Sequence, residues 1–308
     1  MAPSKSELSS RMEVDLRSSD KTGTTIPLVV ANMTAIAGRR MAETVARRGG
    51  LVVIPQDIPF VVVKDVIQYV KSRHTLFDTP ITLSPTQTVA DAASLLHKRA
   101  HGAVVIVEDN KPVGIVTEED LNNVDRFTQL QQVMSKELTT MPDTVDPRQA
   151  FDFLNENRRS LAPVVAKNGE LVGIITKVGA LRATLYSPAV DKSGKLLIAT
   201  AVGINGDVAQ KAAKLVEAGA DVIVVDTAHG HAQGVLDRVK WVKKNFPKAQ
   251  VIGGNIATAN AAKALVDHGA DAVKVGIGPG SICTTRIVAG VGVPQITAVQ
   301  NVAKALAK

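Results

Sequence analysis

The chain has 308 residues, of which 45% are hydrophobic, 21% are charged and 3% are aromatic, and its formal net charge is +7. This composition is typical of a globular protein with room for one large or two medium domains. The positive charge suits nucleic acid or phosphorylated small ligands, but the few aromatic rings and the lack of a Lys/Arg stripe argue against nucleic acid.

The first ten residues, MAPSKSELSS, are polar and do not have the apolar core of a signal peptide. No run of 18 apolar residues occurs in the sequence, so no membrane span is expected.

A strand–helix–strand pattern follows the polar N-terminal stretch. Residues 26–32 form an apolar run, residues 39–48 have helical spacing that ends at a Gly-Gly pair, and residues 51–55 form a second apolar run. This alternation predicts a βαβ unit of a parallel sheet. Asn32 and Met33 stand at the end of the first strand, where α/β folds place ligand contacts, although Asn32 is equally typical of a turn.

An internal duplication interrupts this pattern between about residues 78 and 186. Each copy combines a helical segment with two short apolar strands, and GIVT at residues 114–117 corresponds to GIIT at residues 173–176. A repeated supersecondary unit predicts a separate module inside the α/β domain.

The α/β pattern resumes near residue 195 and contains four more predicted strands, at about 196–202, 221–226, 251–255 and 272–275. Asp226 ends the second of these strands, and the loop TAHGH follows it. A carboxylate at a strand end is well placed to accept ribose hydroxyls. The two histidines of this loop have no further ligand at metal-binding spacing, so a metal site is not expected there.

The strand at 272–275 leads directly into the loop GIGPGSICTTR, which holds the only cysteine of the sequence, Cys283. Its glycines permit positive φ angles and close approach to a ligand. A thiol beside a cation ionises readily and can attack an electrophilic carbon, although a lone cysteine is often only a small buried apolar residue. A single cysteine excludes an internal disulfide framework and suits the reducing cytoplasm.

The string GIGPGSICTTR followed by GVGVPQ resembles the active-site cysteine loop of the IMP dehydrogenase/GMP reductase family, and the duplication resembles the tandem CBS pair inserted in many of its members. The resemblance implies a TIM (β/α)8-type barrel, α/β in class. The barrel would occupy residues 1–76 and 188–308, and the CBS module residues 77–187. Six strands are predicted where closure requires eight, so the barrel is expected to be incomplete and the sequence to be truncated at its C-terminal end.

The resemblance also implies roles for individual residues. Cys283 would add to C2 of the purine ring, and Thr285 would take part in proton transfer. The other implied residues bind ligands: Ser281, Asn32 and Met33 the substrate, Asp226, Thr227, Asn255 and Gly276 the NAD or NADPH cofactor, and the carbonyls of Gly278, Gly280 and Cys283 a potassium ion. In the CBS pair, Thr117 and Asp120 fit a Thr-x-x-Asp pattern that contacts the ribose of an adenine or guanine nucleotide, whereas the second copy has Thr176 and Gly179.

Two reactions of the family remain open. ANMTAIAG, with Thr34-Ala35-Ile36 after the Met, and PQD at 55–57 resemble an actinobacterial branch associated with GMP reduction by NADPH, which favours GMP reductase. DTAHGH and the CBS pair resemble IMP dehydrogenase, which oxidises IMP with NAD. A third hypothesis is a nucleotide-sensing or assembly protein that acts through the CBS pair without turnover. The family implies a cytoplasmic homo-oligomer, a tetramer or an octamer.

Overall fold

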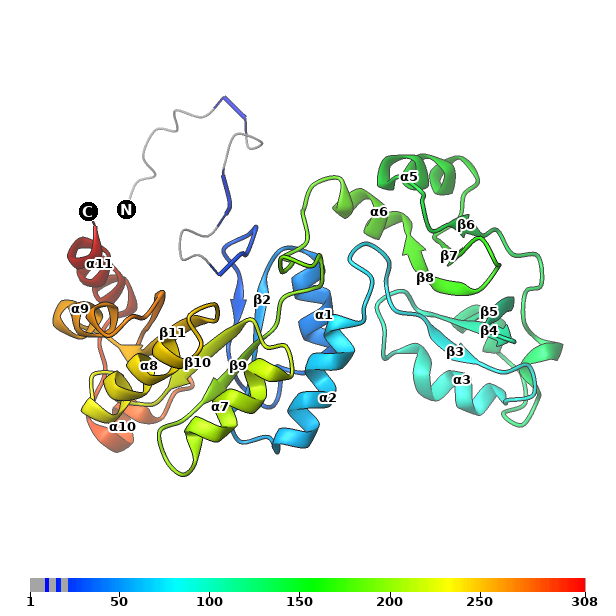
Figure 1. Ribbon diagram of the computed structural model, residues 1–308. Helices are drawn as coiled ribbons and strands as arrows, with labels where there is room; N and C mark the ends of the chain where they lie inside the picture. The colour runs from blue at the N-terminus through cyan, green and yellow to red at the C-terminus, as the bar shows by residue number, and fades with distance from the viewer. Residues whose placement is uncertain (1–8, 11–14, 18–21, 308) are drawn as a thin grey trace. The chain divides into compact units, whose positions relative to one another are not determined.

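The structure is a computed structural model that describes residues 9–10, 15–17 and 22–307, so most of the stretch judged not to be a signal peptide lies outside the described residues. The chain divides into two compact units (Figure 1). Unit 1 combines Met1–Ser72 with Pro188–Lys308, and unit 2 is Arg73–Ser187. Within the described residues, no helix is long and apolar enough to cross a membrane.

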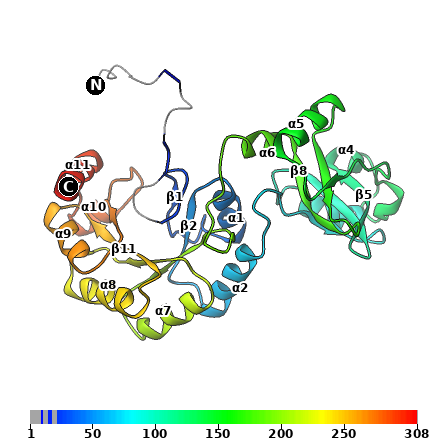
Figure 2. The same cartoon turned by 45° about the horizontal axis from the view of Figure 1, so that its top comes forward.

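Unit 1 is built on a six-stranded parallel sheet in the order β1-β2-β9-β10-β11-β12, which confirms the six predicted strands. The strands are β1 (Val29–Val30), β2 (Leu51–Ile54), β9 (Ala199–Val202), β10 (Val222–Asp226), β11 (Gln250–Ile256) and β12 (Ala272–Val275). The sheet curls into half a barrel, with helices along its outer side (Figure 2).

Helices of unit 1 follow the strands in alternation, as expected for right-handed βαβ connections. They are α1 (Arg39–Arg47), α2 (Phe60–Lys71), α7 (Val208–Glu217), α8 (Gln233–Asn245), α9 (Ala259–Asp267), α10 (Thr285–Ala289) and α11 (Gln295–Leu306). Side chains of Asp207 and Thr258 accept hydrogen bonds from the first turns of α7 and α9, which fixes where these helices begin.

Alternation along the strands separates two apolar layers. Ile223 and Val225 of β10 face the helices, whereas Val222 and Val224 of the same strand face the inner side of the curl. The inner layer is rich in small side chains, such as Ala199 and Ala201 of β9. Because side chains alternate with a period of two, the inner face of each strand end is set by its sequence.

The first strand is shorter than predicted. The run 26–32 was expected to form one strand, but only Val29 and Val30 pair, and only with Leu51 and Val52 of β2. The backbone amide of Leu28 donates to the carbonyl of Ile26 instead, which forms a turn. Within the described residues β1 has a strand on one side only, so the other side offers no ladder that would extend it.

Unit 2 contains two three-stranded sheets, one for each copy of the duplication. The first consists of β3 (Ile81–Leu83), β4 (Ala103–Glu108) and β5 (Lys111–Thr117), and the second of β6 (Met141–Pro142), β7 (Leu161–Val165) and β8 (Leu171–Thr176). Their helical segments are α3 (Val89–Leu96), α4 (Glu118–Leu121), η2 (Leu130–Gln132), α5 (Pro147–Glu156) and α6 (Lys177–Ala183).

Each copy is therefore larger than the predicted helix and two strands. The parallel strands β3 and β6 were missed because three and two residues carry no detectable alternation, and the helices α4 and α6 because four and seven residues are too few to show helical periodicity. Each sheet has its own apolar core, around Leu83 and Leu130 in the first copy and around Phe77 and Leu154 in the second.

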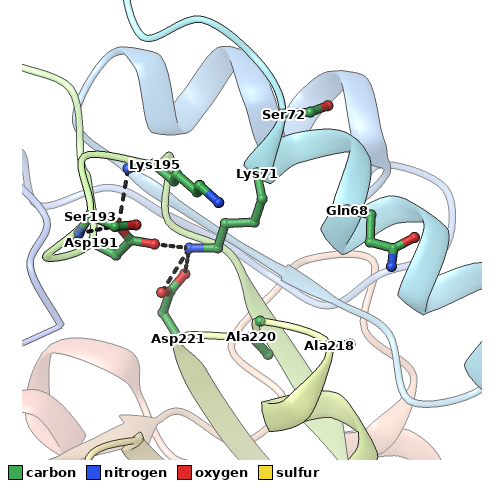
Figure 3. Close-up of a pocket in the computed structure, with 10 residues that line it drawn as sticks. Gln68, Lys71, Ser72, Asp191, Ser193, Lys195, Ala218, Ala220 and Asp221 are labelled. Carbon is green, nitrogen blue, oxygen red and sulfur yellow. Dashed lines mark hydrogen bonds and ion pairs between the residues drawn. The ribbon is translucent and has the colours of Figure 1, made fainter.

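A cluster of ion pairs lies at the N-terminal end of the unit 1 strands (Figure 3). Lys71, the last residue of α2, places its Nζ 2.7 Å from Asp191 Oδ2 and 2.7 Å from Asp221 Oδ2. Asp221 immediately precedes β10, and it also accepts from the Ile198 backbone amide at 2.9 Å. The cluster lines a pocket of about 590 Å³ and is at the opposite end of the strands from the Cys283 loop.

Candidate active site

Three polar side chains meet at the C-terminal end of the unit 1 strands. Asp226 ends β10 on the inner face, and Lys274 of β12 also lies on the inner face, because its neighbours Val273 and Val275 pack against the outer layer. Asn32 follows β1. Segments from three distant parts of the sequence thus supply one polar cluster at the end of the sheet where (β/α)8 enzymes carry out their chemistry.

The cluster is closed by three hydrogen bonds. Lys274 Nζ donates to Asp226 Oδ1 at 2.9 Å and to Asn32 Oδ1 at 2.9 Å, and Asn32 Nδ2 donates to Asp226 Oδ2 at 2.7 Å. The Lys274 and Asp226 side chains are 31% and 17% exposed, so the ion pair is partly shielded from solvent. Asn32 is therefore more than a turn residue, since both ends of its amide are engaged.

The sequence analysis does not single out Lys274, because this residue lies inside the predicted strand 272–275. A cation in such a run is itself a signal, since burial of an unpaired charge is costly and requires a partner nearby.

Thr227 and Asn255 connect this cluster to the cysteine loop. The backbone of Thr227 exchanges hydrogen bonds with Gly254 and Asn255, which extends the pairing of β10 with β11. Asn255 Nδ2 donates to the carbonyl of Gly276 at 2.9 Å. Gly276 is buried, has a φ of 135° and begins the loop after β12. Of the four predicted cofactor-binding residues, Asp226 and Thr227 are thus at the end of β10, and Asn255 and Gly276 are at the ends of the neighbouring strands β11 and β12.

Cys283 lies in the loop between β12 and α10, with its Sγ 3.3 Å from the Thr285 hydroxyl. Hydrogen bonds with the hydroxyl and the backbone amide of Thr285 lower the pKa of the Cys283 thiol, and the charge of Arg286 adds to this effect. The thiolate is the nucleophilic form, so the arrangement increases the reactive fraction at neutral pH. The two predicted catalytic residues are in contact.

We expect Thr285→Val to shift the alkylation of Cys283 by iodoacetamide to higher pH. Removal of the hydroxyl takes away the largest stabilisation of the thiolate, so the pKa should rise toward that of a free thiol. Because Cys283 is the only cysteine, the labelling rate reports on this group alone. Thr284→Val, at the exposed neighbouring position, should leave the midpoint unchanged. An unchanged midpoint in Thr285→Val would show that this hydroxyl does not tune the thiol.

The predicted potassium site does not fit this arrangement of the loop. The Gly280 carbonyl already accepts from the Cys283 backbone amide at 3.1 Å and from Arg286 Nη2 at 3.1 Å. A guanidinium thus occupies the carbonyl that would bind the ion. Among the described residues, no group of three or more His, Cys, Asp or Glu is placed to hold a metal, and His229 and His231 are exposed.

The remaining predicted residues make no side-chain contact with Cys283 or the polar cluster among the hydrogen bonds described. Ser281 is exposed on the cysteine loop, and Met33 is 55% exposed beside Asn32. In unit 2, the Thr117 hydroxyl donates to Asp120 Oδ2 at 2.8 Å, and both residues cap α4. In the second copy Thr176 accepts from the backbone amide of Gly179 at 2.8 Å, so a backbone amide stands where the first copy has a carboxylate.

Comparisons of the sequence agree on one family. The model of the IMP dehydrogenase / GMP reductase domain matches residues 1–308. A GMP reductase of Mycobacterium tuberculosis is 48% identical over 305 residues, which cover 99% of this chain and 64% of the relative. An inosine-5'-monophosphate dehydrogenase of Staphylococcus aureus is 43% identical over 300 residues, 95% of this chain and 61% of the relative. The chain thus spans less than two thirds of the length of these relatives.

Solved structures are similar over nearly the whole chain. A GMP reductase from Trypanosoma brucei in complex with guanosine 5'-triphosphate has a TM-score of 0.66 and 33% identity, covering 98% of this chain and 75% of its own. A variant of that enzyme in complex with guanosine 5'-monophosphate has the same TM-score and identity, and the match covers 98% of this chain and 66% of the variant's chain.

Proposed function

Because the chain belongs to the IMP dehydrogenase / GMP reductase family, we propose that it is a purine-nucleotide oxidoreductase, a GMP reductase that converts GMP to IMP and ammonia. The observation that carries this proposal is the contact between Cys283 and Thr285, which lowers the pKa of the thiol at the end of β12. The 48% identity to a GMP reductase supports the direction of the reaction.

In the proposed reaction Cys283 Sγ forms a bond to C2 of GMP while the double bond between C2 and N3 opens and N3 takes up a proton. The bond from C2 to the exocyclic nitrogen then breaks, and ammonia leaves after protonation, for which Thr285 relays a proton. The dinucleotide NADPH supplies a hydride when bound, which adds to C2. The bond between sulfur and C2 finally breaks with its electron pair on sulfur, which releases IMP and restores the thiolate.

We assign Asp226 of the polar cluster to the nicotinamide nucleotide and Asn32 to the purine nucleotide. The Asp226 carboxylate would accept hydrogen bonds from the cofactor, and Thr227 would also hydrogen-bond to it. Asn255 and Gly276 would lie beside the nicotinamide ring. Asn32, Met33 and Ser281 would contact the purine nucleotide. Lys274 joins the two groups, because it donates to both Asn32 and Asp226.

Lys274→Met should raise the KM for the nicotinamide nucleotide about tenfold, since hydrogen bonds to charged groups contribute more than neutral ones. Asp226 would keep only the Asn32 amide as its partner within this cluster and would no longer be held at one position. Steady-state kinetics with the second substrate saturating would measure the change. Lys263→Met, at an exposed position of α9, is the control. Equal KM values in both variants would contradict the assigned role.

The direction is tested by nicotinamide absorbance in two parallel assays, GMP with NADPH and IMP with NAD. Loss of NADPH in the first supports the reductase. Formation of NADH in the second would establish an IMP dehydrogenase, in which Cys283 adds to C2 of IMP, hydride passes to NAD and water releases XMP. The 43% identity to a dehydrogenase of Staphylococcus aureus is the reason to keep this second candidate. If the nicotinamide absorbance changes in neither assay, both oxidoreductase activities are excluded and only a function of unit 2 is left.

We propose that unit 2 is a tandem CBS module that binds an adenine or guanine nucleotide near Thr117 and Asp120. The duplicated sheets support this assignment. As an assembly or sensor protein, the chain would bind such a nucleotide without turnover. Calorimetric titration of ATP and GTP into the wild type and Asp120→Ala tests the site, and identical binding would exclude it.

The proposed protein is a cytoplasmic homo-oligomer. The family resemblance supports a homotetramer or octamer, and the single cysteine supports a reducing cytoplasm. Potassium would bind at the carbonyls of Gly278, Gly280 and Cys283, where the hydrogen bond from Arg286 to the Gly280 carbonyl would compete with the ion.

A further inference from the structure

The segment 276–294, which carries Cys283 and α10, is closed at its base by two hydrogen bonds. Gln295 Nε2 donates to the carbonyl of Val275 at 2.9 Å, and the backbone amide of Val293 donates to the carbonyl of Ile277 at 3.3 Å. Val275 and Gln295 stand immediately on either side of the segment. The end of β12 and the start of α11 are thereby tied together.

The Gln295 side chain is fixed by its surroundings as well as by its hydrogen bond. A Cβ atom on residue 276 would lie 2.5 Å from Gln295 Oε1, so glycine at this position makes room for the amide. Oε1 is buried and accepts no hydrogen bond from the described residues. The orientation of the amide is therefore set by the bond from Nε2 to Val275.

Inside the loop, Arg286 is packed between glycines. Cβ atoms on residues 278 and 292 would each lie less than 3 Å from the Arg286 Cγ, and the guanidinium reaches the Gly280 carbonyl. Thr285, the neighbour of Arg286 in the sequence, has its hydroxyl oxygen 3.3 Å from Cys283 Sγ. The environment of the thiol thus depends on the closed form of the loop.

The tip of the loop has little other support. Ile282, Ile287 and Val288 are 91%, 86% and 83% exposed, so their side chains do not anchor the loop in the described structure. Beside Gln295, the Asn255 amide holds the next carbonyl, that of Gly276. The position of Cys283 is therefore determined mainly at the base.

We propose that Gln295 is a positioning residue for Cys283. It does not touch the reacting atoms. Its amide holds the loop base in the register that brings Thr285 and Arg286 to the thiol. The inference deepens the proposed function, because it rests on Cys283 being the nucleophile.

The test is the pH dependence of iodoacetamide labelling of Cys283 in Gln295→Met, which keeps the size of the side chain and removes the amide. Gln300→Met makes the same change at an exposed position of α11 and serves as the matched control. We expect the Gln295→Met midpoint to move to higher pH and the rate at neutral pH to fall roughly three- to tenfold, as for the loss of one hydrogen bond. Gln300→Met should match the wild type.

Circular dichroism at the assay temperature checks that each variant is folded. If Gln295→Met is unfolded, Gln295→Glu, which also lacks the amide donor, takes its place. A labelling profile equal to that of the wild type in a folded variant would overturn the inference. Labelling needs no turnover, so the two proposals fail separately. A shifted profile in a protein that converts neither GMP nor IMP would keep the positioning role and reject the oxidoreductase.

Discussion

Cys283→Ala should lower kcat for the conversion of GMP by at least about 10⁴-fold, because removal of a covalent nucleophile takes away the whole reaction path that it opens. No other thiol in the 308 residues can replace it. The side chain is half-buried in a loop, so its loss should leave the fold intact. The rate of NADPH oxidation with saturating GMP measures the effect.

Cys283→Ser is the sharper companion variant, because a hydroxyl keeps the shape of the side chain and is a much weaker nucleophile at neutral pH. Both variants should still bind GMP in a calorimetric titration. Substantial turnover by Cys283→Ser would argue against a covalent intermediate at this residue, and loss of GMP binding would indicate that the substitution disturbed the site as a whole.

Lys71→Met should destabilise unit 1 by about 3–5 kcal/mol, the usual cost of removing one partner from a buried ion pair. The Lys71 side chain is 12% exposed, and Asp191 and Asp221 are 22% and 18% exposed, so solvent would compensate their charges poorly. Trp241 lies on α8 in unit 1 and is the only tryptophan of the sequence. Its fluorescence during urea denaturation therefore follows this unit alone.

The control for this variant is Lys192→Met, an exposed lysine next to Asp191, which should change the unfolding free energy by less than about 0.5 kcal/mol. A similar small loss in Lys71→Met would show that the cluster does not stabilise the fold.

The loss of unfolding free energy caused by Lys71→Met should become smaller at acidic pH. Burial alone would raise the pKa of Asp191, but hydrogen bonds from Lys71, Ser193 and Lys195 outweigh it and lower this pKa. The stability that Asp191 contributes is present above its unfolded pKa of about 3.9 and disappears as the pH falls through the lower folded value.

Asp221 behaves in the opposite sense, because burial raises its pKa and the bond from Lys71 offsets only part of this effect. Without Lys71 both carboxylates should protonate at higher pH. The unfolding free energies of the wild type and Lys71→Met should therefore approach each other below about pH 4. A difference in unfolding free energy that stays constant as the pH falls from about 4 to about 2 would contradict this explanation.

The sequence by itself determined the strands with long apolar runs, the duplication and the cysteine loop. Strand β10 lies where it was expected, because a strand buried on both faces is apolar over nearly its whole length. The glycines and hydroxyls around Cys283 form a continuous string, so their adjacency needed no folding to be seen.

Only the tertiary structure decided which distant residues meet. Asn32, Asp226 and Lys274 are separated by 194 and 48 positions along the sequence, and the curl of the sheet brings their polar atoms within 3 Å. The partners of Lys274 and Gln295 were not predicted, because a hydrogen bond depends on distance and angle between atoms that sequence spacing does not give. The same reason explains β1, whose length depends on a neighbouring strand rather than on its own apolar residues.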